Sequence, residues 1–182
     1  MDNDKIITAR IEDKLEQYER GNYITITGFL NMHEQSLAMR IVKGRSDVKS
    51  FFYGGYDDAE RRIIMFVPDG YADNLEEALD MISPLSVLHV KVATGGRKLT
   101  HRDYLGSVLS LGLDRSVIGD ILVNEKGADM IVTSEIVDFL LAEFHSAGHT
   151  NLQITASDIG ELEVPEQRVK AVRDTLSSPR LD

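Results

Sequence analysis

The stretch that decides the fold runs from Val87 to Leu113 and reads VLHVKVATGGRKLTHRDYLGSVLSLGL. Its first part, Val87–Ala93, alternates apolar and polar residues, which predicts a half-exposed strand. Its last part, Thr100–Leu113, has apolar residues at helical spacing, and Thr100 with Asp103 three positions later is typical of an N-terminal cap. The stretch therefore predicts a strand followed by an amphipathic helix.

The same alternation of strands and helices continues after this stretch. Residues 120–123 and 130–133 predict two short strands, residues 134–147 a second helix and residues 152–155 a last strand. We expect this second helix to face the core with Ile136, Val137, Leu140, Leu141 and Phe144. The resulting order, βαββαβ, is that of the ferredoxin-like plait. None of the predicted strands contains an aromatic residue, which argues against stacking of RNA bases on the sheet.

The chain before Val87 has a different pattern. Ile7, Ile11 and Tyr18 are spaced as in one helix, and Asn31 with Glu34 has the spacing of a capping box that opens a second. Strands are predicted over residues 48–53 and 62–67, and a short helix after Asn74. We therefore expect an α+β protein with an amino-terminal α+β domain (1–84), a ferredoxin-like plait (85–160) and a linker (161–182).

Composition restricts the class of protein. The formal net charge of −10 argues against indiscriminate binding of nucleic acid, which requires a concentration of Lys and Arg. The chain has no cysteine, so disulfides and thiolate metal sites are excluded. No apolar run reaches the ~20 residues of a membrane helix, and the acidic start, Met1-Asp2-Asn3-Asp4, has no signal-peptide core. We expect a cytoplasmic protein without membrane insertion.

One segment departs from the acidic character of the chain. From Lys91 to Arg102 there is no acidic residue, and the segment contains the candidate phosphate-binding residues Lys91, Arg97, Lys98, His101 and Arg102. The last two fall in the first turn of the predicted helix, where free amides and the helix dipole favour an anion. Two interpretations remain open: contact with phosphate, or salt bridges to the protein's own carboxylates.

Other candidate residues are weaker. Arg61 and Arg62 follow the turn Tyr53-Gly54-Gly55-Tyr56 and would extend a binding surface, although nearby acidic residues favour a structural role. His145 and His149 have the spacing of helical metal ligands, but Gly148 between them is expected to end the helix. We assign no catalytic residue, no metal site and no cofactor.

Two blocks of the sequence resemble the YlmH family of bacterial proteins. Residues 99–106, LTHRDYLG, with residues 118–123, IGDILV, are similar to the family's central block. Residues 52–56 with Ala59-Glu60-Arg61 are similar to its amino-terminal block, and residues 177–182 resemble the entry to its carboxy-terminal S-four RNA-binding domain.

The resemblance implies an α+β domain followed by a nucleotide-binding plait, in a cytoplasmic RNA-binding protein that associates with the large ribosomal subunit. It also implies a part in clearing stalled nascent chains, a genetic link to cell division, and residues 161–182 as a linker into a missing S-four domain. The expected partner is RNA, above all ribosomal RNA of the large subunit, with transfer RNA as a further candidate.

Two functions follow as alternatives, and neither is enzymatic. The chain is either an RNA-binding module that acts through backbone charge and shape, or a protein-interaction scaffold whose RNA binding resides in the missing domain. RNA binding that weakens steeply with salt would indicate the first; little RNA binding at any salt would indicate the second.

Overall fold

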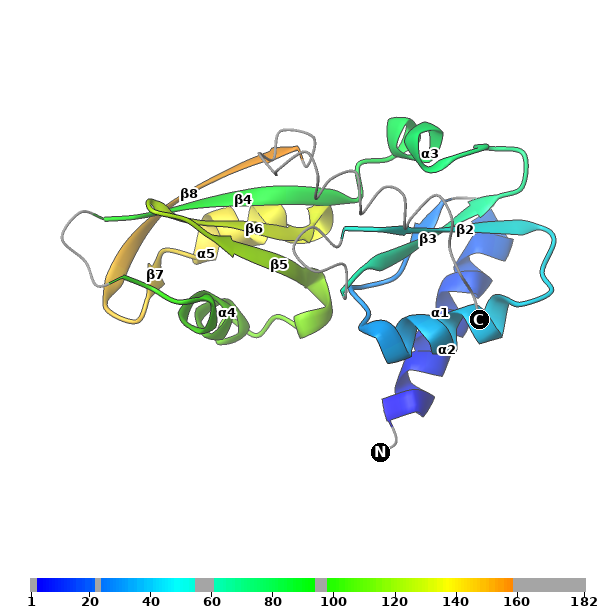
Figure 1. Cartoon of the computed structure of the whole chain (residues 1–182), viewed down its shortest axis with the longest axis horizontal. Helices are drawn as coiled ribbons and strands as arrows, with labels where there is room; N and C mark the ends of the chain where they lie inside the picture. The colour runs from blue at the N-terminus through cyan, green and yellow to red at the C-terminus, as the bar shows by residue number, and fades with distance from the viewer. Residues whose placement is uncertain (1–2, 22–23, 55–60, 94–97, 159–182) are drawn as a thin grey trace. The chain divides into compact units, whose positions relative to one another are not determined.

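The computed structural model describes residues 3–21, 24–54, 61–93 and 98–158. The chain divides into two compact units at the step from Ile82 to Ser83 (Figure 1). Each unit has a sheet of its own. The segments outside the described residues include Arg97, the turn from Gly55 to Glu60 and the expected linker.

The first unit is a small antiparallel sheet with helices. Its elements are α1 (Asn3–Gly21), β1 (Thr25–Ile26), α2 (Met32–Val42), β2 (Val48–Tyr53), β3 (Ile63–Pro68) and α3 (Leu75–Met81), and the strand order is β1-β3-β2. The central strand, β3, is buried along its whole length. As predicted, α1 buries Ile7, Ile11 and Tyr18, and the hydroxyl of Tyr18 donates to the carbonyl oxygen of Asp47 at 2.6 Å.

Local caps start the helices at the predicted residues. The side chain of Asn31 accepts from the amide of Glu34, and the Glu34 carboxylate accepts from the amide of Asn31, each at 2.9 Å. Asn74 caps α3 by accepting from the amide of Glu77 at 2.9 Å, while the Glu77 carboxylate accepts from the amide of Asp73 at 2.8 Å. These bonds satisfy amides that the first helical turn leaves without a partner, so the predicted caps are confirmed.

The second unit has the predicted order of strands and helices. Its elements are β4 (Leu85–Val92), α4 (His101–Leu109), a 3₁₀ turn η1 (Arg115–Val117), β5 (Ile118–Val123), β6 (Gly127–Thr133), a 3₁₀ turn η2 (Ser134–Ile136), α5 (Val137–Glu143), β7 (Ser146–Ala147) and β8 (Thr150–Asp158). The strand order is β5-β6-β4-β8-β7, and all neighbours are antiparallel. Without the two-residue β7, this is the split βαβ arrangement of the plait, so the α+β fold class is confirmed.

Both helices of this unit are shorter than the sequence indicates. The helix α4 ends at Leu109 rather than Leu113, because Gly112 has φ +92°, which a right-handed helix cannot contain. The helix α5 ends at Glu143 rather than Ala147, because Ser146 and Ala147 pair as a strand with the start of β8. Leu141, expected in the core, is exposed.

The sheet of the second unit has one face that the helices cover, and its other face carries buried Leu85 and Val87 at the start of β4 and polar residues toward the end of β4. The helices cover the apolar face, where Leu88, Val90, Tyr104, Leu140 and Phe144 belong to one buried cluster. Alternate residues of β4, His89 and Lys91, lie on the opposite face, as the alternating pattern predicts. In the described residues no helix is long and apolar enough to cross a membrane.

Candidate nucleic-acid interface

In the second unit, β4 ends and α4 begins toward the same end (Figure 1). Lys91 lies near the end of β4, and Lys98, His101 and Arg102 lie just before and in the first turn of α4. The β5–β6 turn, residues 124–127, lies at the same end. Lys91 pairs with Gly127, and the amide of Val92 donates to the carbonyl oxygen of Lys126 at 2.9 Å. The Asn124 side chain shapes this turn by accepting from the amides of Lys126 at 3.0 Å and Gly127 at 2.9 Å. The turn therefore places Lys126 beside the end of β4.

Glycine is required where this turn meets the sheet. A Cβ atom at Gly127 would lie 2.8 Å from the carbonyl carbon of Val90 and would overlap the Val90 oxygen. The close approach of β6 to β4 thus depends on the absence of a side chain at this position.

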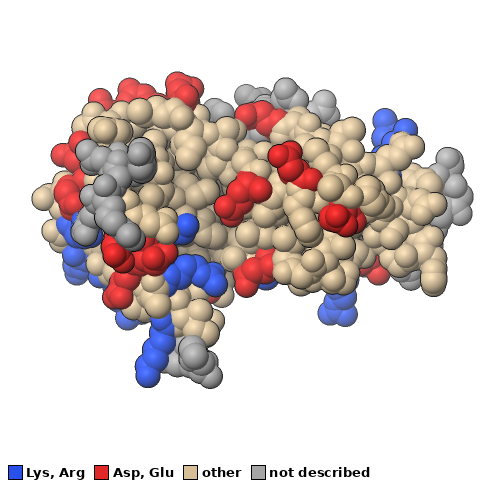
Figure 2. Space-filling model, turned by 180° about the vertical axis from the view of Figure 1, so that it is seen from behind, with Lys and Arg blue, Asp and Glu red and all other residues tan. Residues whose placement is uncertain are grey.

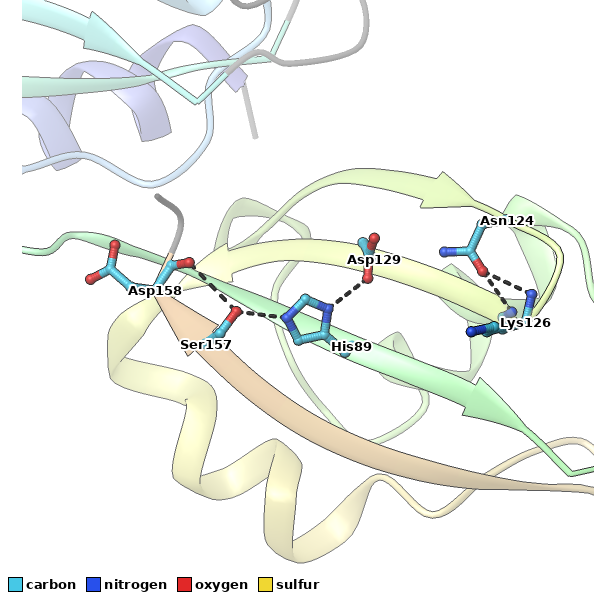
Figure 3. Close-up of polar contacts among 7 residues, drawn as sticks. His89, Asn124, Lys126, Asp129, Ser157 and Asp158 are labelled. Atoms are coloured by element: carbon cyan, nitrogen blue, oxygen red, sulfur yellow. Dashed lines mark hydrogen bonds and ion pairs between the residues drawn. The ribbon is translucent and has the colours of Figure 1, made fainter. Parts of the chain in front are cut away.

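The polar face beside this end carries a chain of hydrogen bonds centred on His89 (Figure 3). Its Nδ1 lies 2.8 Å from Oδ1 of Asp129, and its Nε2 lies 2.6 Å from Oγ of Ser157. The three residues come from β4, β6 and β8, which are adjacent strands. The Ser157 hydroxyl also donates to the carbonyl oxygen of Asp158 at 3.5 Å, which extends the chain of hydrogen bonds to four residues. The network fixes the orientation of the ring.

The bonding order Ser157–His89–Asp129 is that of a nucleophilic triad, but its setting is different. Ser157 lies within a strand, paired with Val87, and not on a strand-to-helix turn that would expose its hydroxyl to a substrate. We interpret these residues as polar surface groups held in place by one another.

A cavity of about 620 Å³ lies on this face next to the basic end. It is lined by His89, Val90, Lys91, Asn124, Glu125, Lys126, Asp129, Gln153 and Thr155. The lining offers hydrogen-bond donors and acceptors, two lysines and two carboxylates. Such a surface suits the polar edges and hydroxyl groups of RNA better than apolar ligands.

The start of α4 forms the other part of the basic end. The hydroxyl of Thr100 accepts from the amide of Asp103, and the Asp103 carboxylate accepts from the amide of Thr100 at 2.8 Å. The cap therefore already places one negative charge at the helix start. Burial raises the pKa of Tyr104, the next residue, and the Asp103 charge raises that pKa further. A phosphate would share this helix start with a carboxylate.

The cations of the basic end have no ionic partner. Among the described residues, Lys91, Lys98, His101, Arg102 and Lys126 form no salt bridge, and all five are exposed. Lys126 was missed by the sequence analysis because only the pairing of Lys91 with Gly127 brings it to this end. Arg97 lies outside the described residues.

The two secondary candidates have different surroundings. Arg62 is only 7% exposed and belongs to the interior of the first unit. Its Nε and Nη2 donate to Oε1 of Gln35, and its guanidinium lies 4.6 Å from the centroid of the Phe52 ring. Arg61 donates from Nη2 to the carbonyl oxygen of Phe29 at 3.3 Å. The contacts with Gln35 and Phe52 hold the side chain of Arg62 in place within the first unit. Within the described residues, no group of three potential ligands is placed to hold a metal ion.

The sequence comparison identifies the family. The profile described as "Putative RNA-binding domain in YlmH" matches residues 63–161. The chain belongs to the YlmH family. The matched range contains every described cation of the basic end, and the predicted family resemblance is confirmed.

Two proteins illustrate the relationship. This YlmH-family chain is 33% identical over 167 residues to the "Ribosome-associated protein quality control protein P2" of Bacillus subtilis (strain 168). The match covers 92% of the chain and 61% of that relative, so the chain spans less than two thirds of the relative's length. The solved structure of the "Cell division protein ylmH from Streptococcus pneumoniae" has a TM-score of 0.65 and 19% identity, covering 88% of this chain and 94% of the other. At 19% identity, the similarity to the Streptococcus pneumoniae structure shows a shared fold.

Proposed function

We propose that this chain binds RNA as part of a ribosome-associated protein, and that the basic end of the plait makes the contact. The observation that carries the proposal is the family match across a surface whose described cations are all exposed and unpaired. Lys91, Lys98, Arg102 and Lys126 are therefore available to phosphates without the loss of an internal salt bridge.

The contact is to the RNA backbone and its shape. The strands β4 to β8 carry no aromatic side chain on which a base would stack. Lysine and arginine at a strand end, a turn and a helix start instead suit phosphates, which position a nucleic acid without reading its sequence. The cavity beside His89 adds polar groups for nucleotide edges or 2′-hydroxyls.

The acidic remainder of the chain restricts the orientation of the RNA. With a net charge of −10, most of the surface repels phosphates, whereas the exposed cations of the basic end attract them. Like-charge contacts disfavour wrong orientations, so the same charge distribution that weakens non-specific binding selects one binding mode.

The finer proposal concerns the biological complex. We infer that the RNA is ribosomal RNA of the large subunit, with transfer RNA beside it, during the handling of stalled subunits. The support is the name of the Bacillus subtilis relative, of whose length the chain spans 61%. A carboxy-terminal S-four domain would add RNA contacts to those proposed for this chain.

The test is a salt titration of RNA binding by the 182-residue chain and its Arg97→Ala/Arg102→Ala variant. The probes are a structured ribosomal RNA fragment and purified large subunits. We expect weaker binding across all RNA sequences and a salt slope shallower by about 0.7–0.9 for each phosphate contact removed. The free energy of unfolding should change by less than about 0.5 kcal/mol.

The matched control is Lys5→Ala/Arg10→Ala, which removes the same charge from α1. Neither residue is in a salt bridge within the described chain, so this variant should bind RNA like the parent. If the plait variant also binds like the parent, or if the parent binds little RNA at any salt, the proposal is wrong and the protein-scaffold alternative takes its place.

A further inference from the structure

The first unit contains a second cavity, of about 810 Å³, between α2 and β2. One wall comes from α2 and the turn after it, with Met39, Arg40 and Lys43, and the other from Val48, Ser50 and Phe52 on one face of β2. Among the described residues, the lining includes the four cations Arg40, Lys43, Arg45 and Arg62 and no carboxylate. In a chain of net charge −10, such a lining requires an explanation.

Arg62 is held rigidly in the wall of this cavity. Oε1 of Gln35 accepts from its Nε at 3.0 Å and from its Nη2 at 2.8 Å, while Nε2 of Gln35 donates to the carbonyl oxygen of Leu30 at 2.8 Å. The ring of Phe52 supports the guanidinium from one side at 4.6 Å. The orientation of the guanidinium is therefore determined by α2 and β2 before any ligand binds.

The buried guanidinium lacks a counter-ion. Its neighbours are a neutral amide and an aromatic ring, and its Nη1 has no hydrogen-bond partner. Burial lowers the pKa of Arg62, since the charged form loses its hydration. A buried cation in a structural role is ordinarily paired with a carboxylate, because an unpaired buried charge is strongly unfavourable. Here that partner is absent among the described residues.

The other three cations of the lining differ in whether they are paired. Arg40 and Lys43 are exposed and form no salt bridge in the described parts of the chain, whereas Arg45 pairs with Asp47 at 2.7 Å. Figure 2 shows several basic side chains gathered over the part of the first unit that carries α1 and α2, while acidic side chains are spread widely. The cavity thus combines a net positive lining with apolar walls.

We propose that this cavity binds the phosphate group of a nucleotide. More than one cation is unmatched, so a multiply charged phosphate balances the lining better than a single carboxylate. Met39, Val48 and Phe52 offer an apolar surface for a base, and Ser36 and Ser50 offer hydroxyl groups for a sugar. The cavity volume falls in the range of about 300–1,000 Å³ of small-molecule sites. A free nucleotide and the phosphorylated end of an RNA both present this group.

The test measures binding of small probes to the full 182-residue chain by calorimetry. The probes are ATP, pyrophosphate, adenosine, a glutamate hexapeptide, and a short single-stranded RNA with and without a 5′-phosphate. We expect ATP and pyrophosphate to bind in the micromolar range with an affinity that falls with salt, and adenosine and the hexapeptide not to bind. If only the 5′-phosphorylated RNA binds, the source of the phosphate is an RNA end.

Two variants locate the site. Arg40→Ala/Lys43→Ala replaces exposed side chains, so it should fold and should weaken ATP binding at least tenfold. Arg62→Lys keeps the charge but not the planar fork, and it should also lose at least tenfold in affinity. The α1 variant Lys5→Ala/Arg10→Ala should bind ATP like the parent.

Three results would overturn the proposal: no binding of any phosphate probe below millimolar concentration, unchanged ATP binding in the Arg40/Lys43 variant, or tighter binding of the hexapeptide than of ATP. The proposal is independent of RNA binding by the plait. The Arg97→Ala/Arg102→Ala variant should retain ATP binding, so failure of one proposal is distinguishable from failure of the other.

Discussion

The basic end of the plait and the cavity of the first unit both contain cations without counter-ions, but in different surroundings. At the basic end, Lys98 and Arg102 are exposed, so water stabilises their charges and the missing partner has little energetic consequence. In the first unit, Arg62 is 7% exposed and its charge has lost most of its hydration. A single unpaired cation in the interior therefore indicates an anion-binding site, whereas at the surface only several unpaired cations together indicate one.

The same difference predicts two kinds of binding. Exposed, flexible cations attract phosphates over a distance and lose much of that attraction in salt. A guanidinium fixed by Gln35 and Phe52 offers one geometry and loses little conformational entropy on binding. We expect the plait to tolerate many RNA sequences and the cavity to discriminate among small anions.

The largest expected effect comes from a substitution that destabilises the second unit and leaves the first unit folded. Gly127→Ala places a Cβ atom against the backbone of Val90, and we expect a loss of about 3–5 kcal/mol in the free energy of unfolding. Urea denaturation monitored with RNA and ATP binding should show RNA binding lost and ATP binding retained.

The control for this substitution is Gly106→Ala in α4. An added Cβ has no neighbour within 4 Å there, and alanine favours the helix by about 0.5–1 kcal/mol. This variant should be slightly more stable than the parent. Loss of both binding activities in the Gly127 variant would show that the two regions depend on one another.

The next prediction compares a buried with an exposed arginine directly. Arg62→Ala removes two hydrogen bonds to Gln35 and the packing on Phe52, and it should lower the free energy of unfolding by about 2 kcal/mol. Arg102→Ala should change it by less than about 0.5 kcal/mol. Chemical denaturation of both variants in parallel measures the difference. Equal changes in the free energy of unfolding would contradict the distinction between a buried and an exposed arginine.

A third prediction extends the basic end onto the sheet. Lys91→Ala/Lys126→Ala should weaken RNA binding about tenfold near 0.15 M salt and make its salt slope shallower by roughly 0.7–0.9 per phosphate contact. ATP binding should not change, because both lysines belong to the second unit. An unchanged salt slope in filter-binding titrations would restrict the RNA contact to the start of α4.

The smallest effect concerns the one paired cation of the cavity. The hydrogen bond from Arg45 holds the pKa of Asp47 below its ordinary value of 3.8. The pair therefore stabilises the fold above about pH 4, and this contribution is lost as the pH falls through the lowered pKa. Asp47→Asn should remove that part of the pH dependence of the melting temperature. It should also tighten ATP binding about twofold, because it removes a negative charge beside the cavity. Weaker ATP binding by the Asp47→Asn variant would contradict the proposal that positive charge in the cavity attracts the phosphate.

Local signals in the sequence predicted the starts of the three capped helices, whereas the starts of β4, β5, β6, α5 and β8 differ by two or three residues from those expected. The caps at Asn31, Asn74 and Thr100 depend on residues three positions apart, so they are visible in a linear pattern. The ends of α4 and α5 were predicted about four residues too late, because the turn at Gly112 and the pairing of Ser146–Ala147 with β8 override the helical spacing. Leu141 was assigned to the core on the same spacing.

The sites were only partly predictable, for a related reason. The basic segment is contiguous in the sequence, so its charge pattern was found directly. Arg62 depends on Gln35, 27 residues away, and His89 depends on Ser157, 68 residues away, and no local pattern indicates either contact. The cavity between α2 and β2 likewise follows from tertiary packing and has no signature in the sequence.

The central position of β4 has a consequence for the dynamics of the proposed RNA site. His89 and Lys91 each pair on both sides, with β6 and with β8, so neither loses its place when one edge of the sheet opens. Their backbone amides should therefore exchange hydrogen with solvent among the most slowly in the second unit. The site persists through partial opening of the sheet, and RNA would meet it already formed rather than induce it.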